Sequence, residues 1–308
     1  MESDRLPRFR RDPKIAAMQI TERDRQIIQL VQRHRFLRSS HITALVGDGS
    51  QQLLRRLQLL YHHGYLERPR AQINYYHQGG SRRMVYGIGN KGAALLKAEL
   101  GPAFHQRNWG EKNRGIGRLF LEHALLVSDV MVALELACRT TGRVRLLLAA
   151  DLSLPETTTR QREPFRWSVI LSNRLKLGLI PDQVFALESA DQPPGRNRAF
   201  FFLEADRATM PVIRRNLSQT SFFRKLLAYE AIWKQGLHHS RFGFHRFRVI
   251  TVTSSRQRVE SLVTACQGLE RGHGLFLFAD RRSLSQTDPL AFNWHTGRPN
   301  ELARLLHA

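Results

Sequence analysis

The chain has 308 residues and carries 48 Lys and Arg against 26 Asp and Glu, a formal net charge of +22. This length suits about two domains of ~150 residues. A hydrophobic content of 42% is enough to build buried cores, which excludes a disordered basic tail. The sequence contains no apolar run of 18 or more residues, so no membrane partner is expected. The excess of cations favours nucleic acid as the partner.

The charge is spread over the whole chain. Residues 1–117 hold 21 Lys and Arg against 9 Asp and Glu, and residues 118–308 hold 27 against 17. A single detachable tail therefore does not explain the excess. The only cysteines, Cys138 and Cys266, form neither a CxxC metal pattern nor a disulfide framework, which predicts a reducing, cytoplasmic location.

The first third of the chain predicts three helices followed by a β-hairpin. Thr21 caps the first helix, Ser39 or Ser40 caps a short second helix, and the third helix covers residues 51–63 and ends at Gly64. Strands are expected at residues 65–68 and 84–88, with an apolar helix at residues 93–100. This order is typical of a winged helix-turn-helix, whose third helix enters the major groove of duplex DNA.

Polar side chains lie where such a domain contacts DNA. Gln and Arg can make bidentate contacts to base edges, and Arg can pair with phosphates. The candidate DNA-binding residues are Gln51, Gln52, Arg55 and Arg56 on the third helix, and Arg68, Arg70, Arg82 and Arg83 beside the wing. Tyr75-Tyr76 would lie in the wing. The alternatives are a solvated helix face and a protein-interaction module.

The second half predicts an α/β domain with a mixed sheet. Long helices are expected at residues 118–139 and 214–234, and a shorter helix at 256–269. Strands are expected at residues 144–149, 184–187, 199–203, 247–252 and 275–279. The predicted organisation is α+β, with a basic tail (1–19), a winged helix-turn-helix (20–102), a linker (103–117), the α/β domain (118–284) and a C-terminal tail (285–308).

Carboxylates gather around two neighbouring strands of this domain. Asp182 begins one strand, and Glu204 and Asp206 end the next, two residues apart and so on one face. Hairpin pairing would bring Asp182 near them. Three carboxylates form a hard-oxygen pocket suited to Mg²⁺ or Mn²⁺, which could activate water against a phosphodiester. Equally, these acids could simply hold arginines such as Arg207, Arg214 or Arg215, or cap a turn.

The helix and strand order, with Pro181-Asp182 and then an apolar strand ending in Glu204, is similar to the core of the PD-(D/E)xK nuclease-like superfamily. That motif places a Lys two residues after the Glu, where this chain has Asp206. The resemblance implies that Lys225 on the next helix could take the role of the missing lysine. It could also be a surface charge.

Over about residues 20–280 the chain resembles the replication-relaxation family of plasmid and mobile-element proteins. The similarity rests on the predicted winged helix with its Tyr86 to Gly92 tail, on Leu121-Glu122-His123 with Asp129, on Ile180-Pro181-Asp182, on residues 202–207, and on the helix with Lys225 and Tyr229. It implies a role in replication, relaxation or mobilisation through DNA binding. A relaxase or replication protein is the implied protein partner, and paired half-sites would be compatible with a homodimer.

Other enzyme classes lack their signatures. His62-His63 and His238-His239 are adjacent and lack the spacer of a His-hydrophobic-His metal pair, so the chain is not expected to be the nickase itself. Residues 87–92 lack the spacing of a phosphate-binding loop, so no nucleotide cofactor is expected. The prediction is a DNA-binding accessory or regulatory protein. The alternatives are a metal-dependent endonuclease using Asp182, Glu204, Asp206 and Lys225, and a protein-interaction scaffold.

Overall fold

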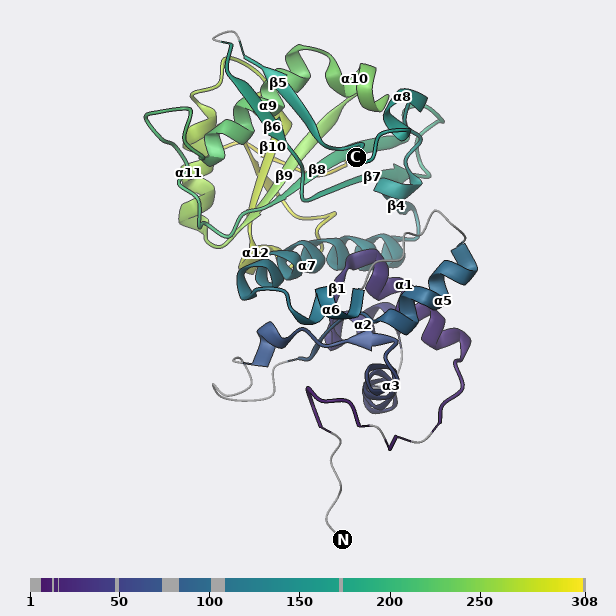
Figure 1. Cartoon of the computed structure of the whole chain (residues 1–308). Coiled ribbons are helices and arrows are strands. Elements are labelled where there is room, and N and C mark those ends of the chain that lie inside the picture. Colours follow the sequence, from purple (N-terminus) through teal and green to yellow (C-terminus); the bar gives the residue numbers. More distant parts are fainter. Residues whose placement is uncertain are drawn as a thin grey trace. The chain divides into compact units, whose positions relative to one another are not determined.

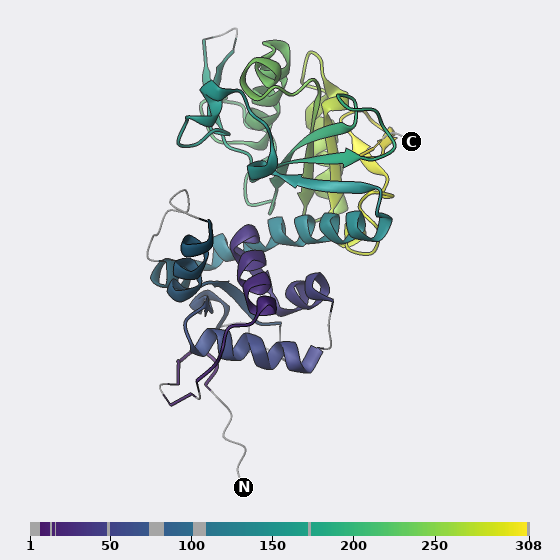
Figure 2. The same cartoon turned by 90° about the vertical axis from the view of Figure 1, so that its right-hand side faces the viewer.

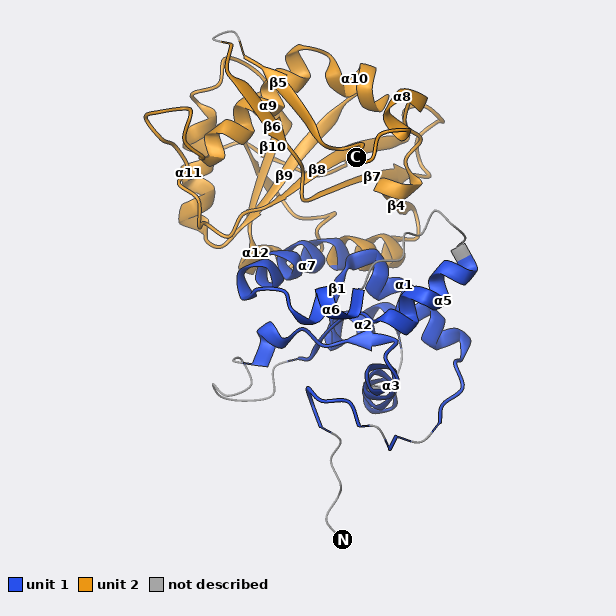
Figure 3. Ribbon diagram, viewed as in Figure 1, with its two compact units in different colours: residues 1–132 blue, residues 133–308 orange. Residues whose placement is uncertain are grey.

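A computed structural model describes residues 7–306 except 13, 16, 48–49, 74–82, 101–108 and 172–173. The chain divides into two compact units, residues 1–132 and 133–308 (Figure 3). The mixed α+β class is confirmed. Arg82 and Tyr75-Tyr76 lie outside the described residues.

Unit 1 contains helices packed around a small three-stranded sheet (Figure 1). Strand β3 lies in its centre and pairs antiparallel with both β1 and β2. The strands are β1 (Phe36–Arg38), β2 (Leu66–Glu67) and β3 (Val85–Ile88). The helices are α1 (Glu22–His34), α2 (Ser39–Val46), α3 (Ser50–His62), α5 (Asn90–Leu100) and α6 (Trp109–Arg114), with a 3-10 turn η1 (Arg70–Gln72).

Local signals explain the first helix of this unit. Thr21 and Asp24 form a capping box, in which each side chain accepts a hydrogen bond from the other residue's backbone N–H. Ile27, Ile28 and Val31 then recur at helical spacing and are fully buried. The sequence predicted this helix because both its cap and its apolar stripe are local.

Two predicted boundaries of unit 1 differ from the structure. Residues 109–114, predicted as linker, form α6, which is held by a hydrogen bond from buried Asn113 to the Ile88 carbonyl (2.9 Å). Part of the predicted N-terminal tail also packs, since Arg11 contacts the Tyr61 carbonyl and the Glu67 carboxylate. Polar contacts hold both segments, and such contacts leave no hydrophobic pattern in the sequence.

The helix α7 (Arg118–Thr141) was predicted to open the second domain, but the boundary between the units falls inside it. Leu121 and Leu125, on its first half, pack with Phe36 and Val85. Ser128 donates a hydrogen bond to the Phe36 carbonyl (2.7 Å). The first half of α7 is therefore part of the core of unit 1.

Unit 2 is built on a seven-stranded mixed sheet of order β12-β11-β10-β9-β8-β7-β4. Strands β8, β9 and β10 are parallel, and the other pairs are antiparallel. The strands are β4 (Val144–Leu148), β7 (Gln183–Ser189), β8 (Arg198–Ala205), β9 (Phe247–Thr253), β10 (Phe276–Asp280), β11 (Trp294–Thr296) and β12 (Leu302–Ala303). Residues 285–308, predicted as a tail, thus supply two strands.

Helices and a hairpin surround this sheet (Figure 2). They are α8 (Glu156–Thr159), β5 (Trp167–Ile170), β6 (Lys176–Leu179), α9 (Phe222–Lys234), α10 (Leu237–Phe242), α11 (Arg256–Cys266) and α12 (Arg281–Leu284), with 3-10 turns η2 (Ala149–Asp151) and η3 (His273–Leu275). The β5–β6 hairpin was not predicted, and α9 begins at residue 222 rather than 214. The helix begins after Ser221, because the backbone carbonyls of residues 211–212 loop back and accept its first two N–H groups.

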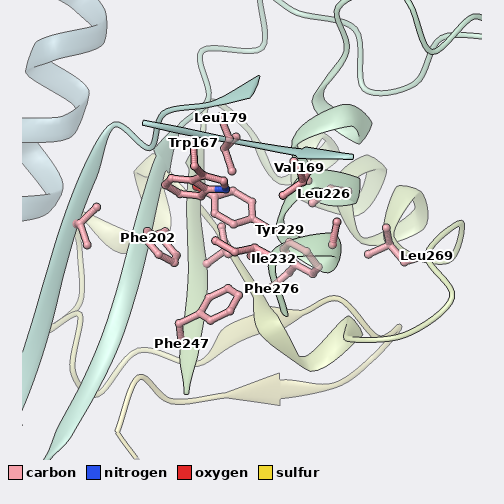
Figure 4. Close-up of a cluster of buried hydrophobic side chains, with 14 of the residues drawn as sticks. Trp167, Val169, Leu179, Phe202, Leu226, Tyr229, Ile232, Phe247, Leu269 and Phe276 are labelled. Carbon is pink, nitrogen blue, oxygen red and sulfur yellow. The ribbon is translucent and has the colours of Figure 1, made fainter. Parts of the chain in front are cut away.

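Aromatic rings fill the core between α9, the β5–β6 hairpin and one face of the large sheet (Figure 4). The Trp167 ring contacts the rings of Phe202, Tyr229 and Phe242 at centroid distances of 5.3–6.2 Å. Large rings contribute much of the buried apolar area in a core of this kind. This packing holds α9 against the strands that carry the candidate acidic residues.

Candidate functional site

Pairing between β7 and β8 brings Asp182 and Glu204 together. Asp182 directly precedes β7, and its backbone N–H bonds to the Leu203 carbonyl (3.0 Å). Its carboxylate accepts a hydrogen bond from the Ala205 N–H (2.7 Å). Glu204 lies between these two residues on β8, so the two carboxylates are neighbours at the C-terminal end of this strand.

Glu204 is buried, with only 1% of its surface exposed. The Tyr229 hydroxyl donates to one carboxylate oxygen (2.6 Å), and the Lys225 ammonium contacts the other. Lys225 and Tyr229 are four residues apart on α9, so both lie on the helix face that meets β8. Asp182, Glu204 and Lys225 therefore form one cluster, which we call the β8 acid cluster.

Burial controls the ionisation of this cluster. Burial raises the pKa of Glu204 to about 7, against the attraction of Lys225, and the nearby Asp182 carboxylate adds to the rise. Burial alone would lower the pKa of Lys225, but Glu204 and Asp182 outweigh it, and its pKa is raised. The cluster thus holds a charged lysine beside a carboxyl group that titrates near neutral pH.

Asp206 makes its hydrogen bonds outside the β8 acid cluster, although its charge contributes to the raised pKa of Lys225. It accepts hydrogen bonds from the Arg258 guanidinium and from the Thr253 hydroxyl, each at 2.8 Å. Its backbone N–H bonds to the Val252 carbonyl of β9. Asp206 is therefore held by residues of β9 and α11, whereas Glu204 is held by residues of α9. The predicted metal pocket of three carboxylates is therefore not formed. No group of three or more His, Cys, Asp or Glu side chains that could hold a metal ion occurs among the described residues.

Arg258 and Thr253 were missed because each follows Asp206 by about fifty residues, and no local pattern connects them. The arginine that pairs with Asp206 is Arg258, which was not among the suggested partners Arg207, Arg214 and Arg215. Tyr229 was predicted as a core residue, and its ring does pack in the core. The sequence signal for its hydrogen bond to Glu204 is its four-residue spacing from Lys225, which places both side chains on one face of α9.

The candidate DNA-binding residues on α3 divide into two groups. Gln51, Gln52 and Arg55 are exposed, opposite the buried Leu53 and Leu57. Arg56 points the other way, and its guanidinium pairs with the fully buried Asp24 of α1 (Nε–Oδ1 2.7 Å). Arg56 was predicted on the polar surface, and instead it fastens α3 to α1.

Arg68 also differs from its predicted place beside the wing. It is buried, donates to the Tyr86 hydroxyl (3.1 Å), and lies over the Tyr61 ring at 4.2 Å from the centroid. Its aliphatic stem and planar guanidinium suit an aromatic pocket, so it cannot reach DNA from there. Arg70 and Arg83 are exposed, as predicted for phosphate contacts.

A family model described as replication-relaxation matches residues 28–246. The chain belongs to the replication-relaxation family. No curated protein and no solved structure gives a significant match. No helix within the described residues is long and apolar enough to cross a membrane.

The replication-relaxation match includes α3 and the whole β8 acid cluster. It ends before Arg258 and before β9 to β12. Asp206 therefore lies inside the matched region while its ion-pair partner lies outside it. The matched region thus includes Asp182, Glu204 and Lys225, but it does not include Thr253 and Arg258, which bind the Asp206 carboxylate.

We predict that Arg56→Ala lowers the free energy of unfolding by about 3 kcal/mol, because it leaves the Asp24 carboxylate buried without a counter-ion. The adjacent exposed residue is the matched control, and Arg55→Ala should change stability by less than ~0.5 kcal/mol. Urea denaturation of the full chain measures both. Equal effects of the two substitutions would contradict the structural role of Arg56.

Glu204→Gln should change the pH dependence of stability. A folded-state pKa of about 7, above the ordinary 4.5, means that the folded protein holds the Glu204 proton more tightly than the unfolded chain. The stability that this proton provides is complete below about pH 4.5 and is lost as pH rises through 7. Relative to Glu204→Gln, the native protein should lose on the order of 3 kcal/mol across this window.

Thermal and urea unfolding from pH 4.5 to 8 measure this difference, with exposed Glu260→Gln as the control. Parallel stability curves for the native protein and Glu204→Gln would show that the Glu204 pKa is not raised.

Proposed function

We propose that this member of the replication-relaxation family binds duplex DNA through α3 and acts as an accessory or regulatory protein in the replication, relaxation or mobilisation of a mobile element. The observation that carries the proposal is the outer face of α3, where Gln51, Gln52 and Arg55 are exposed together. Gln and Arg are the side chains that read adenine and guanine edges in the major groove.

The architecture of unit 1 supports this use of α3. Three helices, a β-hairpin of β2 and β3, and β1 at the edge follow the order of a winged helix-turn-helix. Leu54 is also exposed on the same helix, although large apolar side chains are usually buried. An apolar contact of this kind can meet a thymine methyl group. Arg70 and Arg83 flank the connection between the two strands, where phosphates would lie.

The double substitution Gln51→Ala, Arg55→Ala should weaken duplex binding at least tenfold, since each bidentate contact to a base contributes about 1–3 kcal/mol. Fluorescence anisotropy with duplex fragments of the mobile element, at several salt concentrations, measures the loss. Gln29→Ala, Lys91→Ala removes an exposed glutamine and an exposed cation elsewhere in unit 1. If this control weakens binding equally, α3 is not the contact surface.

A second candidate function is metal-dependent cleavage of a phosphodiester, and the contact of Lys225 with Glu204 favours it. In the order α7, β4, β7, β8, α9, β9, a helix lysine reaches the acid that ends the third strand. This is the placement that a migrated lysine of the PD-(D/E)xK pattern would need.

Asp182 and Glu204 supply the carboxylate oxygens that Mg²⁺ and Mn²⁺ prefer, so these two residues would hold the ion. The ion would polarise the phosphodiester. Lys225 would keep a positive charge beside the phosphate, and Tyr229 would hold Glu204 in place. Asp206 has no part in this site, because Arg258 and Thr253 occupy its oxygens.

Metal-dependent cleavage predicts that the purified protein nicks or linearises supercoiled plasmid only with Mg²⁺ or Mn²⁺. Glu204→Gln and Lys225→Met should each lower the rate at least a hundredfold, while the exposed Glu260→Gln should not. Gel assays of plasmid topology measure this. Cleavage that survives in Glu204→Gln, or none in the native protein with either metal, would exclude the endonuclease function.

A further inference from the structure

Unit 2 contains a large open cavity at the end of the sheet opposite the β8 acid cluster. Its volume is about 1070 Å³, and its walls come from the β7–β8 turn, the starts of β8 and β9, and residues of α9, α10 and η3. Because β8 and β9 are parallel neighbours, their N-terminal ends lie together at this end of the sheet (Figure 1). Arg198 lines the cavity and Glu204 lies six residues further along the same strand, about 20 Å away at the usual rise per residue.

The walls of this cavity are strongly basic. The cavity is lined by four arginines, Arg196, Arg198, Arg246 and Arg248. No carboxylate of the described residues lines it. Arg198 pairs with Glu188 (2.7 Å), and Arg248 donates to the Arg304 carbonyl (2.8 Å). Arg196 and Arg246 form no ion pair with any residue that the structure describes. Two of the four guanidinium groups therefore have no counter-charge there.

Two of these guanidinium groups, those of Arg246 and Arg248 at the start of β9, also repel each other. Burial lowers the pKa of Arg248, and the nearby Arg246 lowers it further. Like charges held close together without a carboxylate are unfavourable unless an anion joins them. The cavity is thus arranged for a ligand that carries negative charge at more than one point.

An aromatic side chain completes the walls. Trp233 of α9 lines the cavity and leaves 37% of its surface exposed, whereas Phe222 and Tyr229 of the same helix are buried. A half-open indole beside arginines is the arrangement on which unstacked bases of single strands are held. Duplex DNA cannot use it, because its bases are already stacked and its phosphates lie on a convex surface.

We propose that this cavity binds a single-stranded nucleic acid, with its arginines on successive phosphates and Trp233 stacked on one base. The volume is at the upper end of ligand pockets, which suits a few nucleotides of a flexible strand. The site is separate from α3 and from the β8 acid cluster, so it does not depend on either proposed function.

The test is fluorescence anisotropy of labelled single strands, oligo-dT and oligo-U of 12 nucleotides, bound to the full chain. Arg196→Ala, Arg246→Ala should weaken binding at least tenfold. It should also lower the slope of log affinity against log salt by about 1.4, since each lost phosphate contact contributes ~0.7. Trp233→Ala should weaken binding at least fivefold, and Trp233→Phe should retain most of it. The two strands show whether the cavity takes DNA, RNA or both.

Arg162→Ala, Arg282→Ala is the charge-matched control, because both residues are exposed in unit 2 and do not line the cavity. It should leave the affinity and the salt slope nearly unchanged. Gln51→Ala, Arg55→Ala should reduce duplex binding without reducing single-strand binding. The two assays therefore distinguish a failure of the α3 proposal from a failure of the cavity proposal. Equal losses in the cavity variant and the control, or no binding of either single strand, would overturn the proposal.

Discussion

The buried carboxylate of Glu204 is the constraint on which the arrangement of unit 2 depends. A carboxylate removed from water is costly unless hydrogen bonds and a counter-charge replace the lost hydration. Lys225 and Tyr229 provide both, and they do so from one face of α9. The rotation of α9 about its axis is thereby fixed, which sets the Tyr229 ring against Trp167 and Phe202 in the aromatic core (Figure 4). The polar cluster and the hydrophobic core share this residue.

The same pairing of buried or half-buried acids with basic side chains organises unit 1. Asp24 is met by Arg56, Glu67 by Arg11 and Arg114, and Asp129 by Arg38 and His41. Each carboxylate joins segments that are distant in the sequence. A considerable share of the arginines is therefore structural, and the count of 48 Lys and Arg overstates the number of side chains that can meet a polyanion. Arg55 of α3, Arg70 and Arg83 beside the predicted wing, and most arginines of the basic cavity are among the cations that remain exposed.

The sequence predicted the elements whose signals are local and periodic. The helix beginning at residue 118 and the strands around residues 184–187 and 199–203 are found close to their expected bounds. The β5–β6 hairpin was not predicted, although Trp167, Val169, Leu177 and Leu179 alternate with exposed residues. For the site, the pairing of Asp182 with Glu204 followed from hairpin geometry. The partners of Arg56, Arg68 and Asp206 depend on tertiary contacts across many residues, which no spacing rule contains.

The loss of Asp206 from the cluster changes what the remaining acids can do near DNA. Three bare carboxylates at one strand end would repel a phosphate, unless a metal ion were already bound. In the structure, Arg258 neutralises Asp206, Lys225 pairs with Glu204, and burial lets Glu204 hold a proton near neutral pH. The cluster then carries little net negative charge. An acidic group inside a strongly basic unit is therefore compatible with the proposed binding of a phosphodiester, beside which Lys225 would supply the positive charge.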